Sequence, residues 1–241
     1  EEMGIAFPGR EYCSRRENNA PGEAVLTVRG LCAGYDGKKI LDGLDADFYK
    51  GKVHAVTGAS GSGKSTFFSI LCRIVPYEGS ILLEGEELKR IRKKAMAHRL
   101  GFVFQNPQDQ FVAQSVYEEM EVSLRQTYEG EKLEAKVKEY LQETGLWRYR
   151  RMSPFMLSQG QQRRLAVAAL LAYDCKVLVC DEPTYAQDVR SLKSVMKLMM
   201  DRVREKGLTL IFSTHDKQLA RDYADIFYTL ADGKLERREG V

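Results

Sequence analysis

Apolar and polar residues alternate along the first part of the chain, which is typical of strands that bury one face. Short runs containing glycine, aspartate or lysine separate these stretches, and residues 34–37 are typical of a turn. The pattern predicts strands at residues 25–31, 39–44, 45–49, 53–57 and 79–85. We therefore expect an amino-terminal antiparallel β-subdomain built from hairpins.

The spacing of apolar residues lengthens in the middle of the chain, where it favours helices. A basic helix is expected at 89–98 and a buried strand at 100–105, followed by helices at 115–125, 131–144 and 159–172. Strands return at 177–180, 208–214, 226–230 and 233–236, with helices at 188–206 and 216–223. Strands that alternate with helices predict an α/β fold with a mostly parallel sheet, interrupted by an inserted helical subdomain at about residues 106–172.

A glycine-rich segment lies between the strand at 53–57 and residues that permit a helix, and it fits the phosphate-loop pattern G-x-x-x-x-G-K-[ST]. Its glycines allow a tight turn in which backbone N–H groups and the positive end of the next helix face phosphate oxygens. The candidate ATP-binding residues are Gly58, Ala59, Ser60, Gly61, Ser62, Gly63, Lys64, Ser65 and Thr66. Lys64 would reach the β- and γ-phosphates, and the Ser65 hydroxyl would be a Mg²⁺ ligand. An ordinary Gly/Ser turn is the alternative interpretation.

Two acids end the apolar strand at 177–180, where ligands of open α/β sheets bind. Asp181 can hold Mg²⁺ through water, and Glu182 can accept a proton from an attacking water molecule. Paired acids at a strand end are also common as solvated residues. Their position downstream of a phosphate loop favours the catalytic interpretation.

Composition narrows the class of protein only slightly. The chain has 241 residues, and its 37 basic and 34 acidic residues give a net charge of +3, too balanced to indicate a nucleic-acid binder. Five scattered cysteines without metal-ligand spacing suggest reduced thiols. The longest apolar run, at 165–173, is shorter than the roughly 20 residues of a membrane span, so no span is expected. Residues 1–24 are interpreted as a flexible leader, a linker or a cloning remnant, and 25–241 as the domain that carries the phosphate loop.

The segment at 157–164, LSQGQQRR, resembles the signature motif L-S-G-G-Q of the ATP-binding cassette (ABC) family, and it precedes the acidic strand as in that family. Tyr35 resembles the aromatic residue that stacks on adenine, and Gln105 resembles the glutamine of the Q-loop. Asp188 is similar to the aspartate of the D-loop, and His215 to the switch histidine. The resemblance spans about residues 25–236 and implies a P-loop NTPase with a RecA-like sheet.

Each of these matches also has a structural interpretation. Tyr35 could pack on the sheet as a turn aromatic, and Gln105 could be a polar residue at a strand end. His215 and Asp188 could serve as helix caps.

The family resemblance implies that two cassettes close head to tail with ATP between them. The partner's ATP would contact Ser158, Gln159, Gly160, Gln161 and Asp188. Gln105 would sense Mg²⁺ and the attacking water, while His215 would hold the γ-phosphate and help to order Glu182. The implied cofactors are ATP and Mg²⁺, and the implied partners are a second cassette and a transmembrane transporter subunit. The protein would then lie peripherally on the cytoplasmic face of the membrane.

Two further segments, at 104–111 (FQNPQDQF) and 153–155 (SPF), resemble the ATPases of energy-coupling factor importers, which take up vitamins, cobalt or nickel. Two positions depart from the family pattern: Gln159 replaces the first glycine of the signature, and the D-loop at 185–188 reads YAQD in place of S-[AG]-L-D. These departures would suit one member of a heterodimer or one half of a tandem chain, and a homodimer stays open.

The alternative functions are a soluble ABC ATPase that acts on nucleic acid or ribosomes, and a regulatory nucleotide-binding subunit. A repair ATPase of this kind would carry a long coiled-coil insertion, which the sequence does not contain, and a regulatory subunit would lack Glu182 or His215. The basic cluster Arg148, Arg150 and Arg151 could contact phosphate backbone, although the sequence favours a solvated or partner-facing helix edge.

Overall fold

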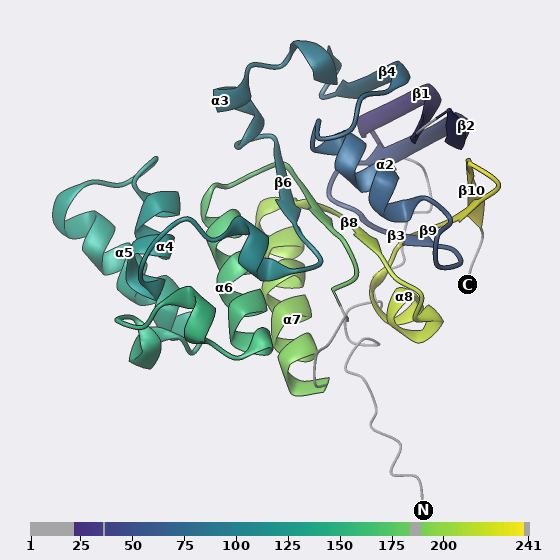
Figure 1. Cartoon of the computed structure of the whole chain (residues 1–241). Helices are drawn as coiled ribbons and strands as arrows, with labels where there is room; N and C mark the ends of the chain where they lie inside the picture. Colours follow the sequence, from purple (N-terminus) through teal and green to yellow (C-terminus); the bar gives the residue numbers. More distant parts are fainter. Residues whose placement is uncertain (1–21, 36, 184–188, 239–241) are drawn as a thin grey trace, which may run out of the picture. The chain divides into compact units, whose positions relative to one another are not determined.

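The computed structural model describes residues 22–35, 37–183 and 189–238 (Figure 1). The chain divides into two compact units. The first unit contains the residues up to Ile91 and those from Thr209 onward, and the second contains Arg92–Leu208. Most of the segment at 1–24 interpreted as a leader, and Asp188 of the D-loop, lie outside the described residues.

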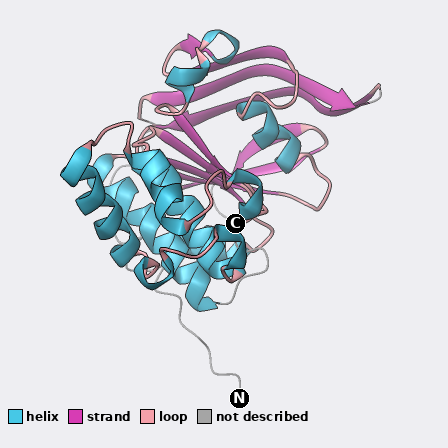
Figure 2. Cartoon of the chain, turned by 60° about the vertical axis from the view of Figure 1, so that its left-hand side comes forward, coloured by secondary structure: helices cyan, strands magenta, loops and turns pink. Residues whose placement is uncertain are grey.

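The first unit contains the antiparallel sheet that the amino-terminal pattern predicts. Its strands are β1 (Ala24–Tyr35), β2 (Lys38–Tyr49), β4 (Glu78–Leu83) and β5 (Glu86–Glu87), and they are ordered β2-β1-β4-β5. Figure 2 shows the long strands of this sheet side by side in magenta. Every neighbouring pair in the sheet is antiparallel.

Two details of the predicted β-region are wrong. Residues 39–49 form the single strand β2, because the break in alternation at Gly43 is a bulge: Leu31 pairs with Leu44 and Ala33 with Leu41, which leaves an extra residue on β2. Gly43 has a φ of 69°, which glycine adopts readily. Residue 35 also belongs to β1 and not to a turn, since the pairing continues to Tyr35 and Lys38.

A second group of strands in the first unit is parallel around a fully buried centre. β3 (Val53–Thr57) lies between β8 (Thr209–Ser213) and β9 (Ile226–Ala231), parallel to both, and β10 (Lys234–Arg238) pairs with β9 in the antiparallel sense. The helices of this unit are α2 (Lys64–Leu71), the 3-10 turn η1 (Leu88–Arg90) and α8 (Lys217–Tyr223).

An aromatic cluster joins β2, β3, α2 and β9 within the first unit. The Phe48 ring lies 6.1 Å from the Phe67 ring, 5.2 Å from that of Tyr228 and 5.3 Å from the His54 imidazole, measured between centroids. His54 is fully buried, and burial lowers its pKa to about 3, so the imidazole is neutral. Its Nε2 accepts a hydrogen bond from the Tyr49 backbone N–H. This cluster anchors β3, the strand that leads into the phosphate loop.

The second unit combines two parallel strands with a group of helices. β6 (Leu100–Val103) and β7 (Val177–Cys180) are parallel and in register from Leu100 and Val177 to Val103 and Cys180. The longer helices are α4 (Val116–Leu124), α5 (Gly130–Glu143), α6 (Gln159–Ala172) and α7 (Val189–Lys206), labelled in Figure 1. Shorter turns are α3 (Lys93–Met96), η2 (Pro107–Gln110), η3 (Trp147–Tyr149) and η4 (Pro154–Met156).

Amphipathic spacing builds the core of this unit. The predicted apolar face of α6, formed by Leu165, Ala168, Ala169 and Ala172, is buried against α4 and α5. The predicted helix at 89–98 is wrong as a continuous element, because it divides into η1 and α3 around an extended Ile91 and Arg92. Ile91 is buried, and its carbonyl accepts a hydrogen bond from Arg73 Nη1 at 2.6 Å, which holds the extended backbone. The predicted limits of the helical subdomain, 106–172, stay a prediction, and α4, α5 and α6 lie within them.

Candidate functional site

The phosphate-loop segment in the first unit follows the buried strand β3 and ends at the start of α2. Gly61 and Gly63 have φ angles of 78° and 103°, and Gly58 has 151°, so all three use backbone conformations that glycine adopts most easily. A Cβ atom on Gly58 would lie 2.5 Å from the Leu230 carbonyl oxygen and 2.8 Å from Ser62 Oγ. The loop therefore requires glycine at position 58 for steric reasons as well as for its backbone angles.

Lys64 lies across this loop. Its ammonium group donates hydrogen bonds to the carbonyls of Gly58 at 2.8 Å and Ala59 at 2.9 Å, and its side chain is buried. Ser60, Gly61 and Ser65 are exposed, whereas Ser62 Oγ is buried and makes no hydrogen bond to the described residues. A cradle with exposed backbone, a cation and a spare hydroxyl fits the oxygens of a phosphate group.

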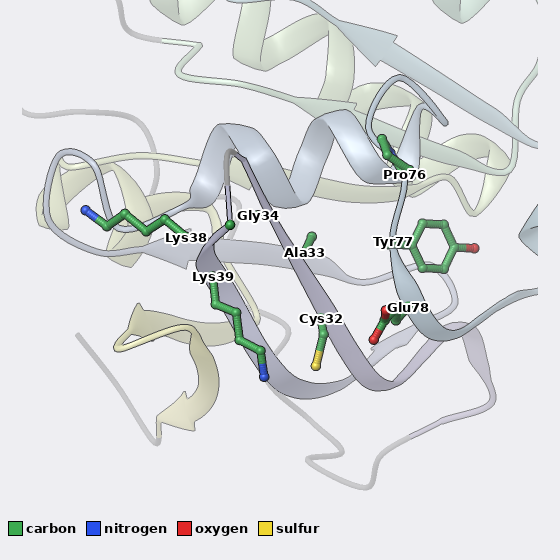
Figure 3. Close-up of a pocket in the computed structure, with 9 residues that line it drawn as sticks. Cys32, Ala33, Gly34, Lys38, Lys39, Pro76, Tyr77 and Glu78 are labelled. Atoms are coloured by element: carbon green, nitrogen blue, oxygen red, sulfur yellow. The ribbon is translucent and has the colours of Figure 1, made fainter.

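Tyr35 ends β1 and is 49% exposed. A pocket of about 370 Å³ lies along the β1–β2 hairpin and the segment Pro76–Glu78, and Tyr35 is not among the residues that line it (Figure 3). Two polar side chains that line the pocket have partners outside it: Lys39 Nζ donates to Asp42 at 3.0 Å. The Tyr77 hydroxyl likewise donates to Glu87. The side chains of Lys38 and Glu78 also line this hollow beside the hairpin.

His215 follows strand β8 in the first unit and is exposed. The Thr214 N–H donates to the Val56 carbonyl at 3.1 Å, so β8 ends level with β3. Asp216, not His215, caps α8, since its Oδ1 accepts from the backbone N–H groups of Gln218 and Leu219. The alternative of His215 as a helix cap is wrong. The histidine and the phosphate loop leave neighbouring parallel strands at the same edge, where α/β proteins bind ligands.

The candidate acids of the second unit follow β7. The Asp181 N–H donates to the Val103 carbonyl at 3.1 Å, and the Asp181 side chain is buried. Glu182 is partly exposed and has a φ of 46°, a left-handed conformation that costs a residue with a Cβ about 1 kcal/mol. Such strain is concentrated at functional sites. Gln105 leaves the adjacent strand β6 and is exposed, so these three residues lie at one edge of the β6–β7 pair.

The signature segment forms the start of α6. Ser158 is its N-cap: Ser158 Oγ accepts from the Gln161 N–H at 3.4 Å, and Gln161 Oε1 accepts from the Ser158 N–H at 2.9 Å. This capping box fixes the first turn of a helix of 14 residues. Ser158 and Gln159 are exposed, and Gly160 is buried. The amino-terminal end of this helix, where a helix attracts anions, is therefore exposed together with a hydroxyl group.

The family model described as ABC transporter matches residues 41–185. The chain belongs to the ABC transporter family. Its fold class is confirmed, since the chain aligns with the structure of cbiO1 from Clostridium perfringens, part of the ABC transporter complex cbiONQ, with a TM-score of 0.77 and 30% identity over 89% of this chain and 87% of that one. The dimeric post-hydrolysis structure of the cassette MJ0796, bound to ADP and Pi, aligns with a TM-score of 0.79 and 28% identity over 89% of this chain and 98% of that one. The cassette is thus an ATPase of this family.

Curated relatives support the narrower resemblance. The energy-coupling factor transporter ATP-binding protein EcfA of Methanocaldococcus jannaschii is 38% identical over 83% of this chain and 73% of its own length. The putative HMP/thiamine import ATP-binding protein YkoD of Bacillus subtilis is 38% identical over 91% of this chain, which spans only 40% of that relative. The interpretation of the sequence as a cassette similar to energy-coupling factor ATPases is confirmed. No helix among the described residues of the cassette is long and apolar enough to cross a membrane.

The two segments that resemble energy-coupling factor ATPases meet in the second unit. The rings of Phe111 and Phe155 pack edge to face with centroids 5.9 Å apart. Gln162 of α6 lies between the segments: its Nε2 donates to the carbonyls of Pro154 and Phe155, and its Oε1 accepts from Gln108 Nε2 at 3.2 Å. The signature helix therefore holds both segments together.

Three large apolar side chains are exposed around this junction. Val112 is 77% exposed, Phe155 52% and Met156 73%. The buried carboxylate of Glu119 accepts hydrogen bonds from the N–H groups of Val112 and Ala113, at 3.0 and 2.9 Å, and so fixes the backbone that presents Val112. We call Val112, Phe155 and Met156 the apolar patch. Large contiguous apolar patches on protein surfaces are typical of contacts with other proteins or membranes.

The structure divides the candidate residues between the two units. The first unit holds Tyr35, the phosphate loop from Gly58 to Thr66, and His215, and the second holds Gln105, Asp181, Glu182, Ser158, Gln159, Gly160 and Gln161. Sequence reasoning missed the apolar patch and Arg163, a fully buried arginine on α6. The signal for Arg163 was an arginine at the start of a helix whose next residues are almost all apolar.

Proposed function

We propose that this cassette binds and hydrolyses ATP to power an importer of the energy-coupling factor type, which takes up a vitamin or a metal ion. Head-to-tail closure with a second cassette would be the step that transmits force. The relatives named EcfA and the neighbour named as part of the complex cbiONQ support this proposal. The cassette would lie on the cytoplasmic face of the membrane, held there by a transmembrane subunit.

In this proposal the first unit binds the nucleotide. Adenine stacks on the exposed face of Tyr35, and the β- and γ-phosphates lie on the backbone of Gly58–Thr66. Lys64 exchanges its hydrogen bonds with the Gly58 and Ala59 carbonyls for phosphate oxygens, at little cost because the side chain is already extended over the loop. His215 contacts the γ-phosphate from the neighbouring strand end.

The second unit supplies the groups that act on water. Glu182 accepts the proton of the attacking water, which requires a carboxylate near the γ-phosphate. Ser65, Gln105 and, through water, Asp181 would hold Mg²⁺, which neutralises the charge that develops on the phosphate oxygens. The donor set fits this ion, since Mg²⁺ is usually held by one or two protein groups together with phosphate oxygens and water.

The signature end of α6 serves the ATP of the partner cassette. Ser158, Gln159, Gly160 and Gln161, together with Asp188, contact the nucleotide that the partner holds. The capping box leaves the Ser158 side chain fixed and exposed, so it can donate to a phosphate oxygen without losing its place at the helix end. The amide side chain of Gln159 changes the chemistry at this interface. We therefore expect the two ATP sites of the assembled dimer to differ, as in a heterodimer.

The observation that carries the coupling function is the apolar patch beside the Q-loop. Val112, Phe155 and Met156 lie on segments tied to the signature helix through Gln162, so a membrane partner seated there would contact the machinery of ATP closure directly. We propose that a helix of the transmembrane subunit covers this patch.

Coexpression with the membrane component and the second cassette tests this function. We expect Val112→Asp and Met156→Asp each to abolish copurification with the membrane component, because a buried carboxylate in an apolar contact is strongly unfavourable. ATP binding by the isolated variants should be unchanged. Ile74→Asp is the matched control, since Ile74 is 58% exposed in the first unit, outside the patch. Retained copurification of both patch variants would refute this docking site.

The alternative of a nucleic-acid machine is less well supported. Two guanidinium groups of the basic cluster lie over aromatic rings of the same unit, Arg148 at 4.5 Å from the Tyr149 centroid and Arg150 at 4.6 Å from that of Trp147. These cation–π contacts give the arginines a structural role. Isolation of the protein only with DNA or ribosomes would favour this alternative.

A further inference from the structure

Arg163 is 1% exposed and is among the largest fully buried side chains of the described residues. It lies on α6, about one and a half turns after the Ser158 cap. Its Nη1 donates to the Phe104 carbonyl and its Nη2 to the Gln105 carbonyl, both at 2.5 Å. One guanidinium group thus holds two consecutive carbonyls at the point where the chain leaves β6.

A buried cation at this position is costly unless it is well placed. Burial lowers the pKa of Arg163, whereas the neighbouring Cys180 and Asp181 raise it. The same guanidinium lowers the pKa of the Cys180 thiol, although burial has the larger effect and raises that pKa to about 12. Packing alone would be served better by an apolar side chain. The positive charge of Arg163 is therefore explained by its position, where the signature helix, the Q-loop and the acidic strand end meet.

Other contacts between α6 and the Q-loop lie further along the segment. Gln110 Nε2 donates to the Ala166 carbonyl at 3.2 Å, and Gln108 Nε2 donates to Gln162 Oε1 at 3.2 Å. Among the described residues, Arg163 provides the hydrogen bond from α6 that reaches Gln105. Gln105 is exposed, although its backbone carbonyl accepts a hydrogen bond from the buried Arg163.

From this geometry we infer that Arg163 is a positioning residue that ties the placement of Gln105 to the position of the signature helix. The inference rests on the proposed function, because it assigns Gln105 to the water-activating site and the end of α6 to the partner's nucleotide. When the partner's γ-phosphate draws the Ser158 end of α6 toward it, the helix moves as a rigid body and both carbonyls move with Arg163. The position of Gln105 in each cassette thereby depends on whether ATP occupies the opposite site.

Arg163→Lys tests the inference in the full chain, since lysine keeps the charge but cannot bridge two carbonyls with a planar fork. We expect faster hydrogen exchange of the amides in a peptide covering residues 104–110, by about tenfold or more, without nucleotide present. In the assembled transporter we expect kcat to fall at least tenfold, while KM for ATP changes less than about threefold. Arg163→Gln, which removes the buried charge, should behave similarly and serves if the lysine variant folds poorly.

Arg202→Lys is the matched control in the same unit, because its guanidinium lies over the Tyr140 ring, with its carbon 5.4 Å from the ring centroid. It should change neither exchange at 104–110 nor kcat. The double variant Arg163→Lys/Gln105→Ala should be no slower than Gln105→Ala alone, because both changes act on one residue. Unchanged exchange at 104–110, or additive losses in the double variant, would overturn the positioning role. A different result would refute the proposed function and not the positioning role. In that case the Arg163 variant would show altered exchange, but the wild-type protein would hydrolyse no ATP with its membrane partner.

Discussion

The phosphate loop and the signature region differ in what holds them in shape. The loop in the first unit is shaped by its backbone: three glycines take positive φ angles, and the one long side chain, Lys64, lies across the loop carbonyls. The signature region in the second unit is shaped by side chains, through the capping box of Ser158 and Gln161 and the buried fork of Arg163.

The two regions therefore depend on different kinds of interaction. The form of the loop requires glycine at position 58, because a Cβ atom there would lie 2.5 Å from the Leu230 carbonyl oxygen. A junction held by hydrogen bonds between Arg163 and carbonyls of a distant segment can move as a body when α6 is displaced. We therefore assign binding to the loop and communication to the region that Arg163 links to α6.

The largest expected effect separates turnover from binding. Replacing Glu182 by Gln removes the proton acceptor while keeping its size, so hydrolysis in the assembled dimer should fall by about 10²- to 10⁴-fold. Nucleotide affinity of the isolated chain should change less than about threefold, because the phosphate loop is unaltered. Steady-state phosphate release and titration calorimetry measure the two quantities.

Glu84→Gln is the control for this variant. Glu84 also has a left-handed backbone, with a φ of 52°, but lies in a turn after β4. Its replacement should leave hydrolysis unchanged. Hydrolysis by the Glu182 variant at the wild-type rate would remove Glu182 from the catalytic role.

The second prediction tests whether backbone sterics alone shape the loop. Gly58→Ala would place a methyl group 2.5 Å from the Leu230 carbonyl oxygen, so the unfolding free energy should fall by about 2 kcal/mol or more. ATP affinity should fall by more than about tenfold, because the loop must shift. Gly61→Ala is the matched case, since a Cβ at that position would meet no atom within 4 Å and only the φ of 78° is strained. It should cost about 1 kcal/mol. Equal stability loss in both variants would contradict the steric argument.

Much of the fold was predictable because its signals are local. The strand at 177–180 and the helix at 159–172 agree with β7 and α6, since a short apolar run and a regular amphipathic repeat need no distant partner to be recognised. The bulge at Gly43 was misread as a break between strands. Only the pairing of Leu31 with Leu44, on another strand, distinguishes the two. The helix expected at 89–98 failed similarly, because Arg73 holds the extended Ile91 from outside the segment.

The same difference between local signals and contacts of distant segments decided which parts of the candidate site were predictable. The phosphate loop was predictable, because Gly58 and Lys64 perform their roles within one short segment. Arg163 was not, because its partners Phe104 and Gln105 lie on a different element and the signature alone does not show what an arginine inside α6 would contact. The apolar patch was missed as well: the segments around Phe111 and Phe155 were recognised separately, and their contact is a property of the folded chain.

The smallest expected effect concerns the two roles assigned to Ser158. Ser158→Ala removes the side-chain cap of α6 and should lower the unfolding free energy by about 1 kcal/mol. Ser158→Asn should restore that stability, since asparagine is an equally good N-cap. Neither variant keeps the hydroxyl group that we assign to the partner's γ-phosphate.

Both variants should therefore lose about tenfold in hydrolysis by the dimer, the loss expected for one hydrogen bond to a charged group. Chemical denaturation of the isolated chain measures the cap, and ATPase assays of the dimer measure the contact across the interface. If Ser158→Asn recovered hydrolysis together with stability, Ser158 would act only as a helix cap. The signature region would then be organised for structure alone, and the contrast with the phosphate loop would no longer be one between binding and communication.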